Sequence, residues 1–320
     1  MAVEPRRRFT GALLLVLALT VGGCAGTTWA VSTLSPGQRV ERVRAVLASG
    51  LDDTPPVLVI AHRGCWQTTS ENSIAAIEAC VAGGIDIVEL DVRRTADGVL
   101  ILMHDETVDR MTNGRGRVED LTLAEIQALR LRRGKGGEGA ALTSESPPTF
   151  EAAMRATRGR VFVNLDAKAD VYDDAFSVLE QVGATDEIIM KRRVAVGEPS
   201  LAAQSPFSRV IAMPIVSDLS GTARDLLKTQ TDPAPPAVEV LFTDRTYLSE
   251  ASGLIRRSGG RVWVNTLRPE ISAGLTDAAA LQAPDAVWGW LLENGVTMIQ
   301  TDEPETLVRY LERRGRRQGL

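Results

Sequence analysis

The chain has 320 residues, and its composition of 44% hydrophobic and 24% charged residues is that of an ordinary globular protein. This length allows one large domain or two small ones, so composition alone does not fix the number of domains. The formal net charge of -5 leaves no broadly basic surface suited to a nucleic acid partner. The arginine-rich segment 313–317 is interpreted as a solvated helix end rather than a binding patch.

The first 24 residues have the pattern of an export signal. Arg6 to Arg8 precede a short apolar stretch from Gly11 to Val21, and two glycines then lead to Cys24. This order is typical of a secretory signal peptide, and the stretch is shorter than the roughly 20 apolar residues that span a bilayer. The tetrapeptide ending at Cys24 resembles a bacterial lipobox, whose cysteine is acylated. We therefore predict a lipoprotein-type signal peptide over 1–23 with a lipid anchor at Cys24; the alternative is an ordinary signal peptide with a bystander cysteine.

The mature protein is then expected on the periplasmic or extracellular side of a bacterial membrane, held there by its lipid anchor. Residues 24–55 combine small and polar residues with a short helical pattern. Pro55 and Pro56 end this pattern, because proline cannot continue a helix. We interpret 24–55 as a linker with a short helix and 56–320 as the main domain.

From Val57 onward, apolar runs of four to six residues alternate with amphipathic helical patterns. Glycine, proline, aspartate or asparagine usually separates the two kinds of segment. The expected strands are Val57–Ala61, Ile85–Asp91, Val99–Met103, Arg160–Asp166, Glu187–Met190, Arg209–Met213, Val238–Phe242, Arg261–Asn265 and Thr297–Thr301. The expected helices are Ser73–Ala82, Tyr172–Val182, Thr222–Thr229, Tyr247–Ser258 and Glu303–Arg313.

Continuously apolar strands that alternate with helices indicate a parallel sheet covered by helices. Over about 250 residues this pattern predicts an α/β fold, a TIM (β/α)8 barrel, although nine candidate strands slightly exceed eight. A doubly wound open sheet is the alternative, but no glycine-rich phosphate-binding fingerprint follows the first strand. The stretch 105–148 interrupts the alternation and is interpreted as a segment inserted after the third strand.

Both histidines of the chain follow apolar runs. The first run leads into His62 and Arg63, and the third leads into His104. In a barrel the C-terminal edges of the strands carry the active site, so we expect the two imidazoles there as general acid and base. Arg63 is expected to hold phosphate oxygens, because a guanidinium can bind two of them at once.

Carboxylates recur at the same edge of the expected sheet. Glu89 and Asp91 are two residues apart, so they share one face of a strand and repel each other unless a cation lies between them. Hard divalent cations such as Ca²⁺ or Mg²⁺ prefer such oxygen ligands. Asp166 is a candidate third ligand, and Lys168 is a candidate partner for a phosphate oxygen. The alternative is a simple salt bridge between Asp166 and Lys168.

With these residues in place, the chain resembles the glycerophosphodiester phosphodiesterase family. The resemblance covers about Val57 to Leu311, and it is most specific in the N-terminal half. The motifs that carry it, in order, are His62-Arg63-Gly64, Glu71-Asn72, Glu89-Leu90-Asp91-Val92, Asp97-Gly98, His104-Asp105 and Thr301-Asp302-Glu303-Pro304.

This resemblance implies a TIM barrel with an inserted segment and one divalent metal held by carboxylates. It implies His62 and His104 as general acid and base, Arg63 as a phosphate ligand, and Glu89 and Asp91 as metal ligands. The expected reaction is hydrolysis of a glycerophosphodiester to glycerol 3-phosphate and an alcohol (EC 3.1.4.46). Action on lysophospholipids or inositol phospholipids is an alternative, and a non-catalytic lipoprotein that binds ligands is another.

The resemblance also places residues whose part is secondary. Asp166 stands where many members of the family carry the glutamate of a Glu-x-Lys motif, so a bridging water is an alternative to direct coordination. Lys168 matches the lysine of that motif and is expected to face the phosphate. Glu71 is expected to cap and orient the helix that follows it, outside the metal's direct ligands. Asp302 is interpreted as the N-cap of the last helix.

Two cysteines, Cys65 and Cys80, remain in the expected mature chain. An export compartment permits them to pair but does not require it. Because Cys80 lies on the apolar side of an expected helix, we interpret both as buried free thiols.

Overall fold

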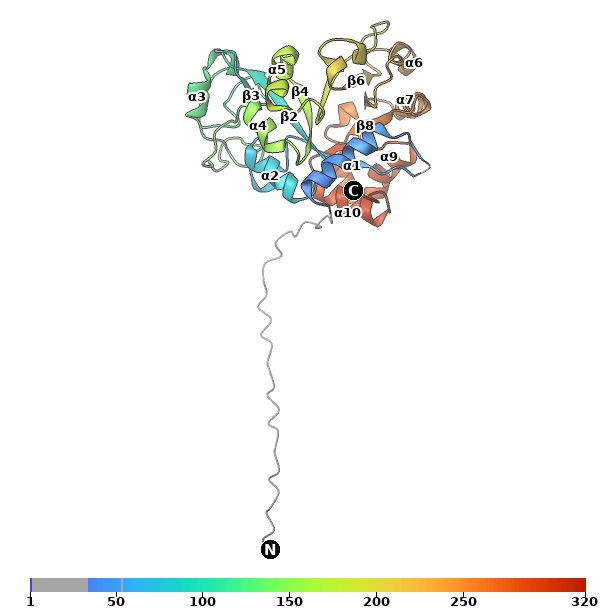
Figure 1. The fold of residues 1–320 in the computed structure, drawn as a ribbon, viewed down its shortest axis with the longest axis horizontal. Coiled ribbons are helices and arrows are strands. Elements are labelled where there is room, and N and C mark those ends of the chain that lie inside the picture. Colours follow the sequence, from blue (N-terminus) through green and yellow to red (C-terminus); the bar gives the residue numbers. More distant parts are fainter. Residues whose placement is uncertain (2–33, 53) are drawn as a thin grey trace.

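The computed structural model describes residue 1, residues 34–52 and residues 54–320 of the chain (Figure 1). The expected signal peptide 1–23 and its Cys24 lie outside these residues and stay predictions. The described strands and helices form one body in which helices surround a central sheet (Figure 1).

Eight parallel strands close into a ring in the order β1-β9-β8-β7-β6-β5-β4-β2, and the pairing of β1 with β2 completes it. A closed ring of parallel strands with helices between them confirms the predicted TIM barrel and makes the open-sheet alternative wrong. All nine apolar runs form strands: β1 (Leu58–Ala61), β2 (Ile87–Arg94), β3 (Leu100–Leu102), β4 (Phe162–Ala167), β5 (Ile188–Arg193), β6 (Ile211–Ser217), β7 (Ala237–Leu241), β8 (Arg261–Asn265) and β9 (Met298–Thr301).

The extra strand is β3, which lies outside the ring. It pairs with β2 in the antiparallel direction, with Leu102 opposite Val92. A tight hairpin joins the two strands, and in it the backbone N–H of Thr95 donates to the carbonyl of Val99 at 2.9 Å. The chain therefore turns back, and the residue after β3 returns to the level of Asp91. The expectation that His104 follows a barrel strand is wrong, yet the hairpin brings it to the same edge.

Helices cover the outside of the ring between the strands that they connect. Most begin after a side chain that accepts a hydrogen bond from the first turn, as Ser73 does for α2 (Ile74–Ala82). The five helical patterns of the sequence correspond to α2, α5, α6, α7 and α10. Besides α2, the described α-helices are α1 (Pro36–Ala48), α3 (Leu123–Gln127), α4 (Phe150–Thr157), α5 (Tyr172–Val182), α6 (Ala223–Leu227), α7 (Arg245–Arg257), α8 (Asp277–Gln282), α9 (Trp290–Glu293) and α10 (Pro304–Arg313).

The helix α1 closes the N-terminal end of the barrel. Its Val43 and Leu47 belong to one buried cluster with strand residues such as Leu58. The guanidinium of Arg261 on β8 also donates to the carbonyl of Val46 at 2.8 Å. A helix across this end leaves the C-terminal edges of the strands as the end at which a barrel binds its ligand.

The inserted segment 105–148 forms a small unit beside β3, with a hydrophobic cluster of its own. The backbone of Gly134 joins this unit to the loop after β1: its N–H donates to Thr69 at 2.6 Å, and its carbonyl accepts from Glu71 at 3.0 Å. The unit is therefore packed rather than a bare loop. Its buried cluster comprises Ile101, Met103, Val108, Met111, Val118, Ile126 and Leu131.

Cys65 and Cys80 form a disulfide, so the interpretation as free thiols is wrong. Their sulfur atoms are 2.11 Å apart and their Cα atoms 5.2 Å apart. Both residues are buried, as expected. The physical reason is that α2 packs its Cys80 face directly against the loop after β1. The resulting distance between the two cysteines cannot be derived from the sequence. The bond ties the His62-Arg63-Gly64 loop to this helix.

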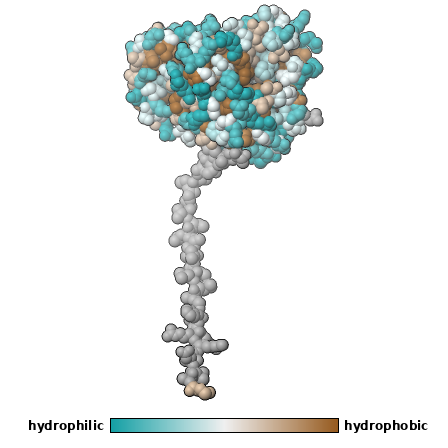
Figure 2. Space-filling view, viewed as in Figure 1, coloured by the Kyte–Doolittle hydropathy of each residue, from teal (hydrophilic) through white to brown (hydrophobic). Residues whose placement is uncertain are grey.

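The face of the molecule drawn in Figure 2 is mainly hydrophilic, with apolar side chains scattered among polar ones. Within 34–52 and 54–320, no helix combines the length and the apolar character needed to cross a membrane. Two large apolar side chains are strongly exposed on loops at the C-terminal end of the barrel: Val196 after β5 is 56% exposed and Leu219 after β6 is 80% exposed.

Candidate active site

The loop after β1 turns sharply to bring its polar side chains to the C-terminal edge. Arg63 and Gly64 both have positive φ angles, 58° and 84°. A Cβ at Gly64 would lie 2.8 Å from the Cβ of Ala76, so only glycine fits between the loop and α2. The left-handed Arg63 directs its backbone N–H at Glu89 Oε2, 2.9 Å away. The turn thus fixes His62 and Arg63 beside the carboxylates of β2.

His62 is oriented by Asp302, which corrects the interpretation of Asp302 as a helix cap. His62 Nδ1 lies 2.8 Å from Asp302 Oδ1, and Arg63 Nε donates to His62 Nε2 at 3.2 Å. Nδ1 therefore carries the proton and donates it to Asp302. The residue that precedes α10 is Glu303, and its side chain makes no capping bond. Asp302 Oδ2 also accepts from Lys135 Nζ of the inserted segment at 2.5 Å.

Burial decides the charge of this pair. It lowers the pKa of His62 by more than the hydrogen bond to Asp302 raises it, so the imidazole is neutral at neutral pH. Burial raises the pKa of Asp302, but the hydrogen bonds and charges of His62 and Lys135 outweigh this effect and lower it to about 2. The pair is thus a neutral imidazole held by a carboxylate.

His104 has a matching carboxylate partner. Its Nδ1 lies 2.7 Å from Asp105 Oδ1, and Asp105 Oδ2 accepts from Arg110 Nε at 2.6 Å. Burial raises the pKa of Asp105, but Arg110 and His104 outweigh it and lower the pKa to about 2. Each histidine of the site therefore has Nδ1 on an ionised carboxylate, and its Nε2 is the nitrogen directed to other partners.

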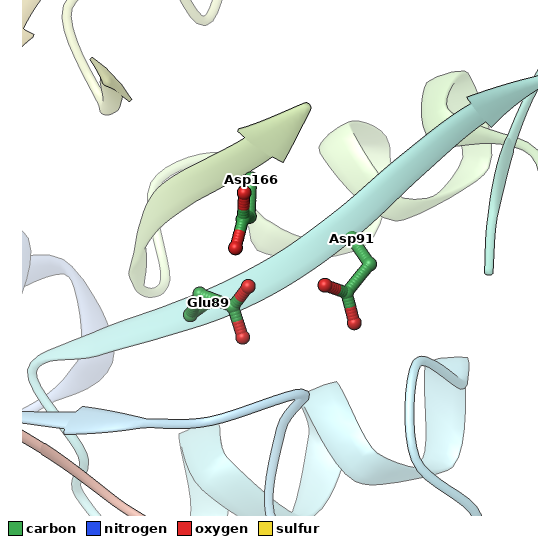
Figure 3. Close-up of side chains that lie close together, drawn as sticks. All are labelled: Glu89, Asp91 and Asp166. Carbon is green, nitrogen blue, oxygen red and sulfur yellow. The ribbon is translucent and has the colours of Figure 1, made fainter. Parts of the chain in front are cut away.

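Three carboxylates converge on two neighbouring strands of the barrel (Figure 3). Glu89 and Asp91 come from β2 and Asp166 from β4, and one oxygen from each lies within 4.8 Å of the others. The sheet register places Asp91 directly beside Asp166. Burial, together with the charges of Asp91 and Asp166, raises the pKa of Glu89 well above its ordinary value. Three carboxylates so close together, with Glu89 and Asp91 buried and Asp166 partly exposed, favour a cation among them.

The chemistry of these oxygens fits a divalent metal ion. Glu89 Oε1 is buried and has no hydrogen-bond partner among the residues that the structure describes. Buried polar atoms normally have a partner, so this oxygen is suited to a ligand that the protein alone does not supply. Glu89, Asp91 and Asp166 are the three residues that the sequence selected, and the fold brings all three together.

Two cations balance the carboxylates. Lys168 Nζ lies 3.0 Å from Asp91 Oδ1 and 3.0 Å from Asp166 Oδ2. Arg63 Nε lies 3.3 Å from Asp91 Oδ2. Burial raises the pKa of Asp91, but Lys168 and Arg63 outweigh burial and lower it below its usual range. The salt bridge between Asp166 and Lys168 does form, and it is one part of a larger cluster.

Glu71 orients cations and does not cap the helix. Its buried carboxylate accepts from Arg63 Nη1 at 3.1 Å and from Arg110 Nη2 at 2.5 Å. The cap of α2 is Ser73, whose hydroxyl accepts from the backbone N–H of Ala76 at 3.0 Å. The expected helix-capping role of Glu71 is therefore wrong. Its place outside the three-carboxylate group agrees with the expectation that it is no direct ligand.

Sequence reasoning missed several polar residues that shape the site. Asn72, at a positive φ of 54°, donates to Asp91 Oδ2 at 2.7 Å and accepts from the backbone N–H of Asp91 at 3.0 Å. Arg110 links Asp105 to Glu71, and Lys191 lies 3.8 Å from Asp166 Oδ2. One feature of the sequence could have indicated Lys191: it ends the apolar run of β5. A charged side chain at that position points into the barrel or toward its C-terminal edge.

A cavity of about 580 Å³ lies against the loops that follow β4 and β5. Ala169, adjacent to Lys168 in the chain, borders it. Tyr172 and Phe207 line it with ring centroids 4.9 Å apart, and the Tyr172 hydroxyl donates to the carbonyl of Lys191 at 3.1 Å. Neither Lys168 nor the three carboxylates line this cavity, which lies beside the site.

The fold and this site match a known family. The model of the glycerophosphoryl diester phosphodiesterase family matches residues 62–306, which is most of the chain. The chain therefore belongs to the glycerophosphoryl diester phosphodiesterase family. The matched range includes both histidines, the three carboxylates and the inserted segment.

Individual relatives match shorter parts. The chain is 56% identical over 72 residues to a glycerophosphodiester phosphodiesterase of Caldanaerobacter subterraneus, covering 22% of this chain and 30% of that protein. It is 39% identical over 119 residues to human glycerophosphodiester phosphodiesterase 1, covering 37% of this chain and 35% of the relative. The matched segments thus span about a third of the length of these relatives.

Solved structures share the fold at lower identity. A glycerophosphoryl diester phosphodiesterase from Parabacteroides distasonis has a TM-score of 0.69 and 21% identity, covering 86% of this chain and 92% of that one. A phosphodiesterase from Oleispira antarctica, solved with the product sn-glycerol-3-phosphate, has a TM-score of 0.57 and 18% identity, covering 80% and 97%. At these identities the likeness establishes the barrel.

Proposed function

We propose that this protein is a divalent-metal-dependent phosphodiesterase that hydrolyses glycerophosphodiesters to glycerol 3-phosphate and an alcohol (EC 3.1.4.46). The observation that carries the proposal is the site itself: two histidines, each oriented through Nδ1 by a carboxylate, lie at the edge of the barrel that also carries three converging carboxylates. Family membership supports the same reaction. The related Oleispira antarctica protein was solved with sn-glycerol-3-phosphate, which supports the substrate class.

Glu89, Asp91 and Asp166 would hold the metal, and oxygen ligands of this kind suit Ca²⁺ or Mg²⁺. When bound, the ion supplies positive charge that polarises a phosphoryl oxygen. Arg63 and Lys168 line the same cluster and stabilise the negative charge that develops on the phosphoryl oxygens. Their guanidinium and ammonium groups therefore orient the phosphate toward the histidines.

The two histidines move the protons. One accepts a proton from the attacking hydroxyl, and the other donates a proton to the oxygen of the leaving alcohol. Asp302 and Asp105 hold the two rings by Nδ1, so Nε2 is the nitrogen that faces the reaction. The cavity beside Tyr172 and Phe207 starts one residue after Lys168 in the chain and is our candidate place for the alcohol group.

One observation favours a second substrate class, phosphodiesters that carry an acyl chain. Val196 and Leu219 expose apolar surface on loops at the C-terminal end of the barrel. A Cβ at Gly221 would lie 2.9 Å from Val196 Cγ2, so the two loops touch. Exposed apolar side chains at the end of the barrel that carries the site suit a lipid-derived substrate such as a lysophospholipid.

A substrate panel separates these candidates. Glycerophosphocholine, glycerophosphoglycerol, lysophosphatidylcholine and phosphatidylinositol are assayed with Ca²⁺, with Mg²⁺ and with EDTA, and products are identified by mass spectrometry. We expect glycerol 3-phosphate from the first two substrates, and we expect EDTA to abolish its release. Full activity in EDTA would contradict metal dependence. Activity on the acylated substrates alone would favour the second class.

We also propose that the protein is exported and anchored to a bacterial membrane through Cys24. The Cys65–Cys80 disulfide supports export, because disulfides persist in oxidising compartments. We expect Cys24→Ser to leave an unacylated protein that no longer sediments with membranes, measured by cell fractionation. Unchanged mature size and membrane association in this variant would contradict the lipid anchor.

A further inference from the structure

Lys191 and Glu239 form a buried ion pair inside the barrel, next to the three carboxylates. Lys191 on β5 is 4% exposed and Glu239 on β7 is 2% exposed. Lys191 Nζ lies 3.0 Å from Glu239 Oε2 and 3.8 Å from Asp166 Oδ2. The ammonium therefore lies between Glu239 and a carboxylate that would bind the metal.

Lys191 is charged despite its burial. The carboxylates of Glu239 and Asp166 lie 3.0 Å and 3.8 Å from its ammonium and compensate the charge. A buried ammonium is stable only when a carboxylate compensates it, and breaking a buried pair leaves a costly unpaired charge. Lys191 must therefore keep a carboxylate partner in the folded protein.

The partner that Lys191 uses is held rigidly on its other side. Glu239 Oε1 accepts from Asn265 Nδ2 at 2.8 Å, and Asn265 Oδ1 accepts from Trp263 Nε1 at 2.7 Å. Both supporting residues belong to β8. Because this chain of hydrogen bonds fixes the Glu239 carboxylate, it also fixes the ammonium at a longer distance from Asp166 than from Glu239.

We propose that Glu239 is a positioning residue for the metal centre: it holds Lys191 away from Asp166 and so leaves Asp166 free to bind a divalent cation. This inference rests on the metal centre of the proposed function. Without the charge of Glu239, the Lys191 ammonium pairs with Asp166 and competes with the cation for that carboxylate. The pair therefore sets the affinity for the cation through Asp166.

The test measures Ca²⁺ binding by isothermal titration calorimetry to the full chain stripped of metal. Glu239→Gln can keep an acceptor oxygen for Asn265 but removes the charge and the carboxylate oxygen that holds Lys191, so we expect Ca²⁺ to bind at least about tenfold more weakly. Adding Lys191→Met to this variant removes the competing ammonium. We expect the double variant to recover Ca²⁺ affinity to within about threefold of the wild type, a recovery that a merely structural role does not produce.

Asp86→Asn is the matched control. Asp86 is a fully buried carboxylate paired with Arg317, and it lies before the start of β2, at the other end of the barrel. We expect this variant to keep wild-type Ca²⁺ affinity even if it loses stability. Circular dichroism establishes the folding of each variant.

Unchanged Ca²⁺ affinity in Glu239→Gln, or no recovery in the double variant, would overturn the inference. If Glu239→Gln does not fold, Ca²⁺ binding to the single variant Lys191→Met is the test. We expect this variant to bind Ca²⁺ at least as tightly as the wild type. Weaker binding overturns the inference. A wild-type protein that binds neither Ca²⁺ nor Mg²⁺ contradicts the proposed metal centre instead, so the two failures are distinguishable.

Discussion

Asp302 links the first and last strands of the barrel at the site. It follows β9, and it binds His62, which follows β1. The local sequence, an aspartate two residues before a proline, indicated a helix cap. Asp302 contacts His62 because the barrel closes. Closure pairs Ala61 with Thr301, so the residues that follow these two lie side by side. Local patterns do not contain such long-range pairs.

The low pKa of Asp302 predicts a pH-dependent contribution to stability. In the folded protein its pKa is about 2, whereas an unfolded aspartate has a pKa of about 3.9. The unfolded chain therefore binds more protons between these values, so the contribution is present above about pH 4 and is lost as the pH falls toward 2. At neutral pH this contribution to the free energy of unfolding is of order 2 kcal/mol. Structural relaxation in a variant reduces the difference that is measured.

Urea unfolding of the wild type and Asp302→Asn at pH 6 and pH 3 measures this contribution. We expect Asp302→Asn to be the less stable protein at pH 6, and we expect the gap to narrow at pH 3. The exposed Asp173→Asn is the control, with a small difference at both pH values. A gap for Asp302→Asn that stays constant or grows on acidification contradicts the assigned pKa.

The site residues that the sequence selected share one property: a polar side chain at the end of an apolar run. This property identified His62, Glu89, Asp91 and Asp166, because strand ends meet at one edge of a barrel. It did not identify Glu239, which lies within the apolar run of β7 and contacts Lys191 across the barrel interior. Such a contact depends on which strands face each other.

At the scale of elements, the nine strands were predictable, because each is an apolar run bounded by turn residues. The direction of β3 was also accessible, because Asp97-Gly98 between two apolar runs is a typical hairpin signal. Gly98 has the positive φ, 82°, that such a turn requires. Reading that dipeptide as a hairpin removes the extra barrel strand and predicts that the chain returns to Asp91.

The disulfide and the inserted segment were less predictable. Cys65 lies in a loop and Cys80 on α2, and their separation depends on how far that helix is rotated against β1. The inserted segment has weak periodicity, yet its small hydrophobic cluster orders it. This order matters for the site, since Lys135 and Arg110 of the segment bind Asp302 and Asp105.

At the scale of the whole molecule, a cluster of charged side chains lies at the C-terminal end and inside the barrel. Three cations, Arg63, Lys168 and Lys191, lie among four carboxylates, Glu89, Asp91, Asp166 and Glu239. With all seven groups ionised, +3 and -4 leave a net charge of -1. A divalent cation changes this to +1, which is opposite to the single charge of a phosphodiester. A divalent cation among these carboxylates would offset their negative charge and so favour the binding of a phosphodiester anion.

We propose that His62 and His104 are the acid–base pair of this site. The most direct measurement is glycerol 3-phosphate release from glycerophosphocholine by His62→Asn and His104→Asn, followed by ³¹P NMR in saturating Ca²⁺ or Mg²⁺. Calorimetry on the same variants reports metal affinity. We predict that each variant loses at least about a hundredfold in rate while it still binds the metal. A wild-type rate in either variant would show that its histidine is not part of the acid–base pair.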